Sequence, residues 1–336
     1  MQSKRTSRRL GFENLEARAL LAGNVMVSVE NNVLLVTGDN AANRIDIRQL
    51  PASGAATPWP GARYEIVGYV PTKGPPTLVN GQRSVIVEGV KDGAKINMQG
   101  GNDSIWISRP RSGDSLAAIP GKVDIDMGEG DDRATLYLIN YQQVNVNLGK
   151  GADSTYIPGK FFALNVVGDP TWQAGDPPGG DHIRLAFSAA GPVSIDAGYG
   201  DNTIDGSLKT TTKYGTVDIK TGNGADKVSI NTPTSVLAAL MRIDTGHGSD
   251  SISLGEIKSR SNIGINTGGG DDFLFFRDIE VSGYLSLWMG DGDDTLVSRN
   301  TNHAESVVFR GGDGKDTLDL GGNNTFTSQD ISGFEA

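Results

Sequence analysis

A five-residue turn of the form Gly-x-Gly-x-Asp recurs along the chain and constrains the fold more than any other feature. Complete copies occupy residues 149–153, 222–226, 246–250, 268–272, 290–294 and 312–316, and weaker copies occupy 99–103, 128–132, 177–181 and 198–202. Successive fifth positions lie 29, 21, 28, 21, 24, 24, 22, 22 and 22 residues apart. A period of this size indicates stacked supersecondary units, each burying its apolar side against the next.

The residues on either side of each turn alternate in hydrophobicity. Positions five, three and one before the first glycine are apolar or small, as in Val217, Ile219 and Thr221. Positions two and four after the aspartate are apolar, as in Val228 and Ile230. Period-two alternation places these side chains on one face of a β-strand. One strand therefore enters each turn and a second strand leaves it.

These patterns predict an all-β, right-handed parallel β-helix or β-roll solenoid with about ten coils of 21–29 residues. Further apolar residues between the strands, such as Ile257 and Ile279, leave room for a third short face in each coil. We expect residues 1–23 to be a targeting segment outside the fold. Residues 24–93 are predicted to form N-terminal strands and a cap with Pro/Gly-rich loop insertions, and 94–336 the repeat solenoid with its C-terminal cap.

Composition narrows the possible functions. The chain of 336 residues has no cysteine, so disulfides, thiolate metal sites and thiol catalysis are excluded. The formal net charge of -10 argues against nucleic acid as a partner, because binding to phosphates relies on basic side chains. No run of 18 apolar residues occurs, so the sequence predicts no transmembrane helix. An acidic surface suits the binding of cations, or simply solubility.

The aspartate of each turn is predicted to point inward. It has the same parity as the inward residues that follow it, so its carboxylate should lie beside backbone carbonyl groups on the concave side of the corner. In a parallel stack these carboxylates are about 4.8 Å apart, and each adjacent pair repels by roughly 0.9 kcal/mol even in water. A cation bound between two turns would replace this repulsion by attraction to both carboxylates. Calcium suits such a site because it accepts six to eight oxygen ligands, carbonyl oxygens included.

The turns resemble the repeat of the RTX calcium-binding β-roll family, Gly-Gly-x-Gly-x-Asp followed by an apolar residue. The best match is Gly-Gly-Asp-Gly-Lys-Asp-Thr-Leu at residues 311–318, and the resemblance spans roughly residues 95–320. In that family, turn carbonyls and the aspartate hold calcium between coils. The resemblance therefore implies Ca²⁺ as the cofactor, with Asp103, Asp132, Asp153, Asp181, Asp226, Asp250, Asp272, Asp294 and Asp316 as ligands and an amide at Asn202 in one coil.

The sequence departs from that family in its period. The family repeats every nine residues and has turns on both sides of a coil, whereas here one motif per 21–29 residues allows a single row of ions. A metal-free alternative stays open, in which each aspartate caps its own turn by accepting backbone N–H groups. Asp131, Asp271 and Asp293, one position earlier, are expected to point outward into solvent.

A second resemblance lies near the N-terminus. The segment Leu-Glu-Ala-Arg-Ala-Leu-Leu at residues 15–21, preceded by Arg-Arg-Leu-Gly-Phe-Glu at 8–13, resembles the LEPR-x-LL segment of large surface proteins in planctomycete bacteria. Ala17 stands where that family has proline. The resemblance implies export from a bacterial cell and an extracellular or cell-surface location.

An enzymatic function has less support in the sequence. Some parallel β-helices, such as those resembling pectate lyases, cleave polysaccharides, and scattered basic and aromatic residues could line a sugar groove here: Arg109, Arg111, Tyr141, Trp172 and Arg184. No catalytic constellation accompanies them. The sequence therefore predicts an exported, non-catalytic structural or adhesive surface protein whose turns bind calcium ions, with a cell-surface or matrix polysaccharide as a further candidate partner. A metal-free solenoid and a carbohydrate-active β-helix remain the alternatives.

Overall fold

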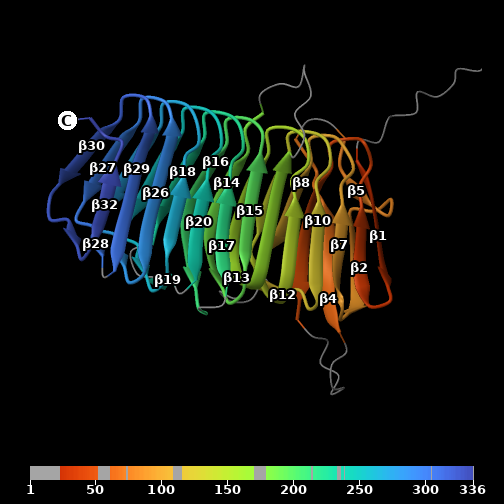
Figure 1. Ribbon diagram of the computed structural model, residues 1–336. Helices are drawn as coiled ribbons and strands as arrows, with labels where there is room; N and C mark the ends of the chain where they lie inside the picture. Colours follow the sequence, from red (N-terminus) through yellow and green to blue (C-terminus); the bar gives the residue numbers. More distant parts are fainter. Residues whose placement is uncertain are drawn as a thin grey trace, which may run out of the picture.

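The protein is an all-β parallel solenoid, as predicted. The computed structural model describes residues 23–51, 61–72, 75–108, 116–169, 179–212, 215–232, 236–237, 239–303 and 305–335. Figure 1 shows the coils stacked in sequence order, from β1 (Asn24–Glu30) at one end to β30 (Thr317–Gly321) and β32 (Gln329–Ser332) at the other. Residues 1–22 of the expected targeting segment lie outside the described residues.

The strands that follow the turns form one parallel face, which we call the post-turn face. Each strand pairs in register with its counterpart in the next coil, so that Ile105 lies beside Ala134 and Val228 beside Ile252. In chain order the face contains β3 (Arg44–Leu50), β8 (Ser104–Ser108), β11 (Arg133–Leu136), the first part of β13 (Ser154–Asp169), β14 (His182–Ala189), β16 (Thr203–Thr210), β18 (Lys227–Asn231), β21 (Ser251–Gly255), β24 (Phe273–Arg277), β27 (Thr295–Arg299) and β30.

The strands that lead into the turns form a second parallel face, the pre-turn face. Its register follows the same spacing, with Val217 beside Met241 and Met241 beside Ile263. The face contains β2 (Val33–Thr37), β7 (Gly93–Asn97), β10 (Lys122–Asp126), β12 (Leu138–Asn147), the second part of β13, β15 (Val193–Gly198), β17 (Thr216–Lys220), β20 (Leu240–Asp244), β23 (Ile263–Asn266), β26 (Tyr284–Asp291), β29 (Ser306–Asp313) and β32.

A third, shorter face joins the two in the later coils. It consists of two-residue strands only: β19 (Val236–Leu237), β22 (Lys258–Ser259), β25 (Glu280–Val281), β28 (Asn302–His303) and β31 (Thr325–Phe326). Ile257 and Ile279, the two residues that suggested this face in the sequence, are both buried.

The N-terminal segment contributes both antiparallel pairs and the first stacked strands. β1 pairs antiparallel with β2 and parallel with the short β5 (Leu78–Val79). β4 (Ala62–Gly68) lies antiparallel to β3 and to β6 (Ser84–Val90). β2 and β3 in turn pair parallel with β7 and β8, so stacking begins within the segment expected to form the cap. The two-residue β9 (Ala117–Ala118) pairs with β12.

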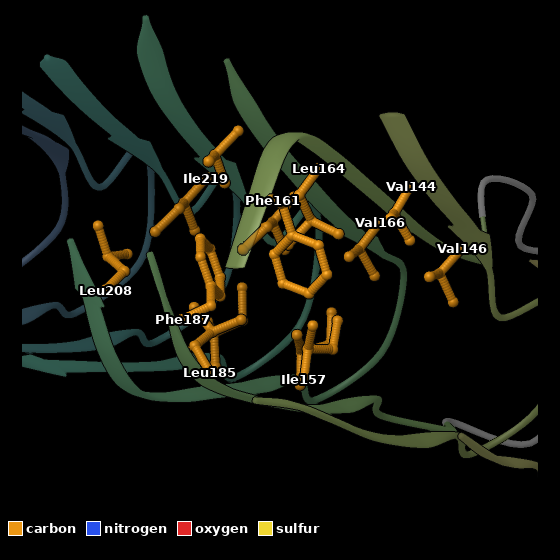
Figure 2. Close-up of a cluster of buried hydrophobic side chains, with 14 of the residues drawn as sticks. Val144, Val146, Ile157, Phe161, Leu164, Val166, Leu185, Phe187, Leu208 and Ile219 are labelled. Atoms are coloured by element: carbon orange, nitrogen blue, oxygen red, sulfur yellow. The ribbon is translucent and has the colours of Figure 1, made fainter. Parts of the chain in front are cut away.

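The core is a continuous apolar column between the faces. Figure 2 shows Val144, Val146, Leu164 and Val166 of the pre-turn face pointing toward side chains of the post-turn face, among them Ile157. All of these side chains are buried, because alternate strand residues face the interior. The fourth position after the aspartate was expected to be buried in every coil. In the last coil this position, Leu320, is 37% exposed, since β30 pairs along its length with β27 alone. Nowhere in the described chain is there a helix long and apolar enough to cross a membrane.

Candidate metal centre at the stacked turns

The two glycines give each turn its shape and let successive turns approach closely. Gly222 has φ +87° and Gly224 has φ +146°, conformations that residues with a Cβ rarely adopt. A Cβ on Gly224 would also lie 2.1 Å from the carbonyl oxygen of Gly200 in the preceding turn. Glycine is therefore required here both for backbone conformation and for the stacking of turn on turn.

The fifth residue of each turn, which we call a rung, is buried as its parity predicted. The rung aspartates are at most 3% exposed. One carboxylate oxygen, Oδ1, accepts a hydrogen bond from the backbone N–H of the preceding rung, as from Asp226 to Asp250 at 2.9 Å. Ten such bonds run in one direction, with donor–acceptor distances of 2.6–3.0 Å, through Asn43, Asp103, Asp132, Asp153, Asp181, Asn202, Asp226, Asp250, Asp272, Asp294 and Asp316.

These bonds differ from the metal-free arrangement considered above, in which an aspartate caps its own turn. Here the donor belongs to the neighbouring coil, so each side chain joins two coils. Each of these bonds uses one oxygen of a carboxylate, and the other oxygen takes no part in it. The second oxygen, Oδ2, is buried without a hydrogen-bond partner in all nine rung aspartates, from Asp103 to Asp316. The hydroxyls of Thr221, Thr245 and Thr267 lie near three of these carboxylates and help to lower their pKa, but they donate to carbonyl oxygens of the next coil. An unpaired buried oxygen is costly, and a carboxylate oxygen more so.

Asn202 reveals what surrounds this second atom. Its Oδ1 accepts the N–H of Asp181 at 2.8 Å, just as a rung aspartate would. Its Nδ2 occupies the place of Oδ2 and donates to three carbonyl oxygens, those of Gly200 at 2.9 Å, Thr221 at 2.8 Å and Gly198 at 3.3 Å. Two of these oxygens belong to its own turn and one to the next coil. Carbonyl oxygens thus line the place of the second side-chain atom, and the amide of Asn202 donates N–H groups to them.

Asn43 repeats the amide part of this arrangement at the first rung, while its Oδ1 is buried without a hydrogen-bond partner. Its Nδ2 donates to the carbonyl oxygens of Ala41 at 2.7 Å and Asp39 at 3.2 Å, the same two positions of its own turn. The sequence motif did not identify Asn43. Its turn lacks both glycines and the aspartate of the motif, and it lies 60 residues before Asp103. The pairing of β3 with β8 identifies it.

Two glycines in other coils place the aspartate oxygen itself near the same lining. A Cβ added to Gly168 would lie 2.1 Å from Asp181 Oδ2 and 2.2 Å from the carbonyl oxygen of Ala197. A Cβ on Gly311 would meet Asp316 Oδ2 and the carbonyl oxygen of Gly333. A carboxylate oxygen and a carbonyl oxygen of the next coil therefore converge where Asn202 places its amide nitrogen.

Burial and the neighbouring rungs oppose ionisation of these carboxyl groups. Burial raises the pKa of Asp103 and Asp153 to about 8 and that of Asp181 to about 7, with smaller contributions from nearby carboxylates. The same cause raises the pKa of the other rungs, to about 7 in Asp226 and Asp272, about 6 in Asp132 and Asp294, and upward in Asp250 and Asp316. Either a proton or a cation must offset this cost near neutral pH.

The donor set determines which cation could be held. In the described part of the chain, no three His, Cys, Asp or Glu side chains converge as a metal bound by side chains alone would require. Each rung offers one carboxylate oxygen together with backbone carbonyl oxygens. These are hard oxygen donors without nitrogen or sulfur, which suits calcium better than zinc.

The outer aspartates of the turns are exposed, as predicted, yet they do more than face solvent. Asp131 accepts the backbone N–H of Ala152 at 3.1 Å, and Asp271 accepts that of Asp293 at 2.9 Å. Asp293 in turn accepts the N–H of Lys315. The outer bonds run toward the following coil, opposite in direction to the inner ones, so the two sets of carboxylates cross-link the turns in both directions.

The residues considered for a sugar groove are only partly described. Arg109, Arg111 and Trp172 lie outside the described residues, as does the side chain of Tyr141. Arg184 is exposed on β14, with Nε 3.7 Å from Asp205 Oδ2, and His182 of the same strand pairs with Asp205. The sequence reading did not identify this His182–Asp205 pair, because its members are joined only by the register of β14 with β16.

Comparison with family models, with curated proteins and with solved structures finds no match for this chain.

Proposed function

We propose that this is an exported, non-catalytic structural or adhesive protein whose stacked turns bind calcium, and that the ions hold the coils of the solenoid together. One observation carries the proposal. Nine buried Oδ2 atoms have no partner, whereas in the one mid-row rung that has an amide the corresponding atom donates to three carbonyl oxygens. A bound cation would supply at the aspartates the positive charge that the amide hydrogens supply at Asn202.

Calcium would act by linkage. An ion that binds the folded stack and not the unfolded chain stabilises the fold by RT ln(1 + [Ca]/Kd), about 2.7 kcal/mol for one site at a hundredfold excess over Kd. Extracellular calcium modules have Kd values of about 10⁻⁴ to 10⁻³ M. The fold would therefore be strongest outside the cell, where calcium is abundant, which agrees with the export proposed from the N-terminal resemblance.

A metal-free solenoid is the second candidate, and the raised pKa values of the rung carboxyl groups support it. A protonated carboxyl group could donate from Oδ2 to a facing carbonyl oxygen and satisfy both atoms without an ion. The two candidates differ in pH dependence. Proton occupancy ends as the pH rises above the rung pKa values of about 6 to 8, whereas calcium binding strengthens there.

Thermal melting near pH 8.5, in EDTA and in millimolar calcium, distinguishes the two. We expect calcium to raise the melting temperature markedly and magnesium to raise it much less, because magnesium requires stricter octahedral geometry. A melting temperature unchanged by calcium at this pH, together with no heat in a calcium titration, would exclude calcium binding and favour the metal-free solenoid.

A further inference from the structure

A row of outward side chains, several of them large, crosses five coils of the post-turn face. In register along β8, β11, β13, β14 and β16 stand Trp106, Thr135, Tyr156, Arg184 and Asp205. Tyr137, which follows β11, fills the gap in this row. Its ring centroid lies 6.4 Å from that of Trp106, with the ring planes 16° apart, and 5.9 Å from that of Tyr156.

Arg184 continues the contact beyond the rings. Its guanidinium carbon lies 5.5 Å from the centroid of the Tyr156 ring, within the range of a cation–π interaction. We call Trp106, Tyr137, Tyr156 and Arg184 the aromatic strip. Its members touch from coil to coil and so form one surface along the solenoid axis.

The fold does not need this strip. Its side chains point away from the core, and Trp106 is 47% exposed. The next two coils carry Ser229 and Ser253 in the same row, ahead of Phe275, and the strands there pair in the same register. Exposing large rings to water in contiguous contact is characteristic of a binding surface.

The charges around the strip indicate the kind of ligand. Arg133 stands on β11, in register with Ser104 and Ser154, and forms no ion pair with any described residue. Arg184 and His182 share the single carboxylate of Asp205. Asp46 lies in register with Trp106, but it is paired with Arg48. Basic groups therefore border the rings on a chain whose net charge is -10. Guanidinium groups bind planar oxyanions through paired N–H donors, so the favoured partner is anionic.

We propose that the aromatic strip binds a linear acidic polysaccharide, one with carboxylate-bearing sugars, whose chain runs along the solenoid axis. The rings would contact the C–H faces of the sugars, because the face of an aromatic ring is electronegative. Arg133 and Arg184 would hold the carboxylates. The proposal gives the adhesive role above a class of ligand and rests on that role. A single-stranded nucleic acid could also use rings and arginine, but its binding relies on a basic groove that follows the phosphate backbone, and the strip offers only two arginines for one.

The test uses the full chain in calcium, with its folding checked by circular dichroism. Binding of short oligogalacturonates and of hyaluronan is measured by calorimetry, alongside neutral dextran and single-stranded RNA. We expect binding to the two acidic glycans, weakened by salt, and about tenfold weaker after Trp106→Ala or Arg184→Gln. The matched controls are Trp288→Ala, an exposed tryptophan of the pre-turn face, and Arg242→Gln, whose side chain is 64% exposed like that of Arg184.

The outcomes separate this proposal from the calcium proposal. Failure of the calcium-loaded protein to bind either acidic glycan would overturn it, and so would equal losses in the strip variants and the controls. Tighter binding of RNA or dextran would assign the strip to that ligand instead. A calcium titration of the same samples shows independently whether the turns bind ions.

Discussion

The rung at Asn202 and the next rung, at Asp226, form the same backbone hydrogen bond and have opposite chemistry at one atom. Both accept a backbone N–H through Oδ1, from Asp181 and from Asn202 respectively. The second atom is a satisfied donor in Asn202 and an unpaired acceptor in Asp226. The difference shows that the backbone bond does not require a charge. The aspartates must therefore be explained by what their second oxygen binds.

The largest expected effect is the pH dependence of stability that the whole row of rung aspartates produces. Their pKa values are raised to about 6 to 8 in several rungs, against about 3.9 in an unfolded chain. Between these limits the folded protein binds more protons than the unfolded chain, so the free energy of unfolding falls as pH rises from about 4 to about 8. Denaturant melts in EDTA across this range should show that fall, and calcium should remove most of it above pH 7. A flat profile would contradict the burial of ionisable rungs.

A single inner aspartate should matter far more than its outer neighbour. Asp272→Ala leaves the N–H of Asp250 buried without an acceptor and removes an ion ligand, so we expect a loss of roughly 2–4 kcal/mol in calcium. Asp271→Ala is the control, since Asp271 accepts one backbone N–H in an exposed position and should cost under about 1 kcal/mol. Equal losses in urea denaturation would show that the two oxygens of Asp272 have no special role.

Asp272→Asn converts a rung into the form seen at Asn202. The Oδ1 bond is kept and the amide can donate to the turn carbonyls, so in EDTA near pH 8 we expect stability to rise by about 1–2 kcal/mol. In saturating calcium the same variant lacks one ion and should be less stable than the parent. The reversal of sign, followed by urea denaturation in both buffers, is the signature of an ion site. A change of the same sign in both buffers argues for proton occupancy instead.

The reverse substitution gives the smallest effect in buffer that contains calcium. Asn202→Asp replaces three amide hydrogen bonds by an unpaired oxygen and should lower stability in EDTA by roughly 1–2 kcal/mol, with calcium restoring most of it. The Asn231→Asp control changes an exposed asparagine of β18 and should be nearly neutral in both buffers. A loss at Asn202 that calcium does not restore would mean that this site has no room for an ion.

The sequence predicted the coil period and the inward direction of the rungs because both follow from local rules. The glycines of the turn at 222–226 specify positive φ, and period-two alternation fixes which side chains face the core, as for Val228 and Ile230. The spacing of the rungs along the chain is also the spacing of their hydrogen bonds, 24 residues from Asp226 to Asp250.

Contacts between coils could not be read from the sequence. The donor to each Oδ1 comes from the neighbouring coil, and that partner is defined only once the register is known. Asn43 was missed for the same reason, since its turn has no motif and the inserted strands β4 to β6 separate it from the next rung. The contact of Tyr137 with Trp106 likewise joins residues from different coils.

A count of bound calcium ions tests the central claim most directly. Calorimetric titration near pH 8 would compare the parent chain with Asp272→Asn and Asn202→Asp. We predict that the parent binds several calcium ions, that Asp272→Asn binds one fewer and that Asn202→Asp binds one more. No heat of binding in the parent, or the same number of ions in all three proteins, would contradict the assignment of a cation to the second oxygen of each rung.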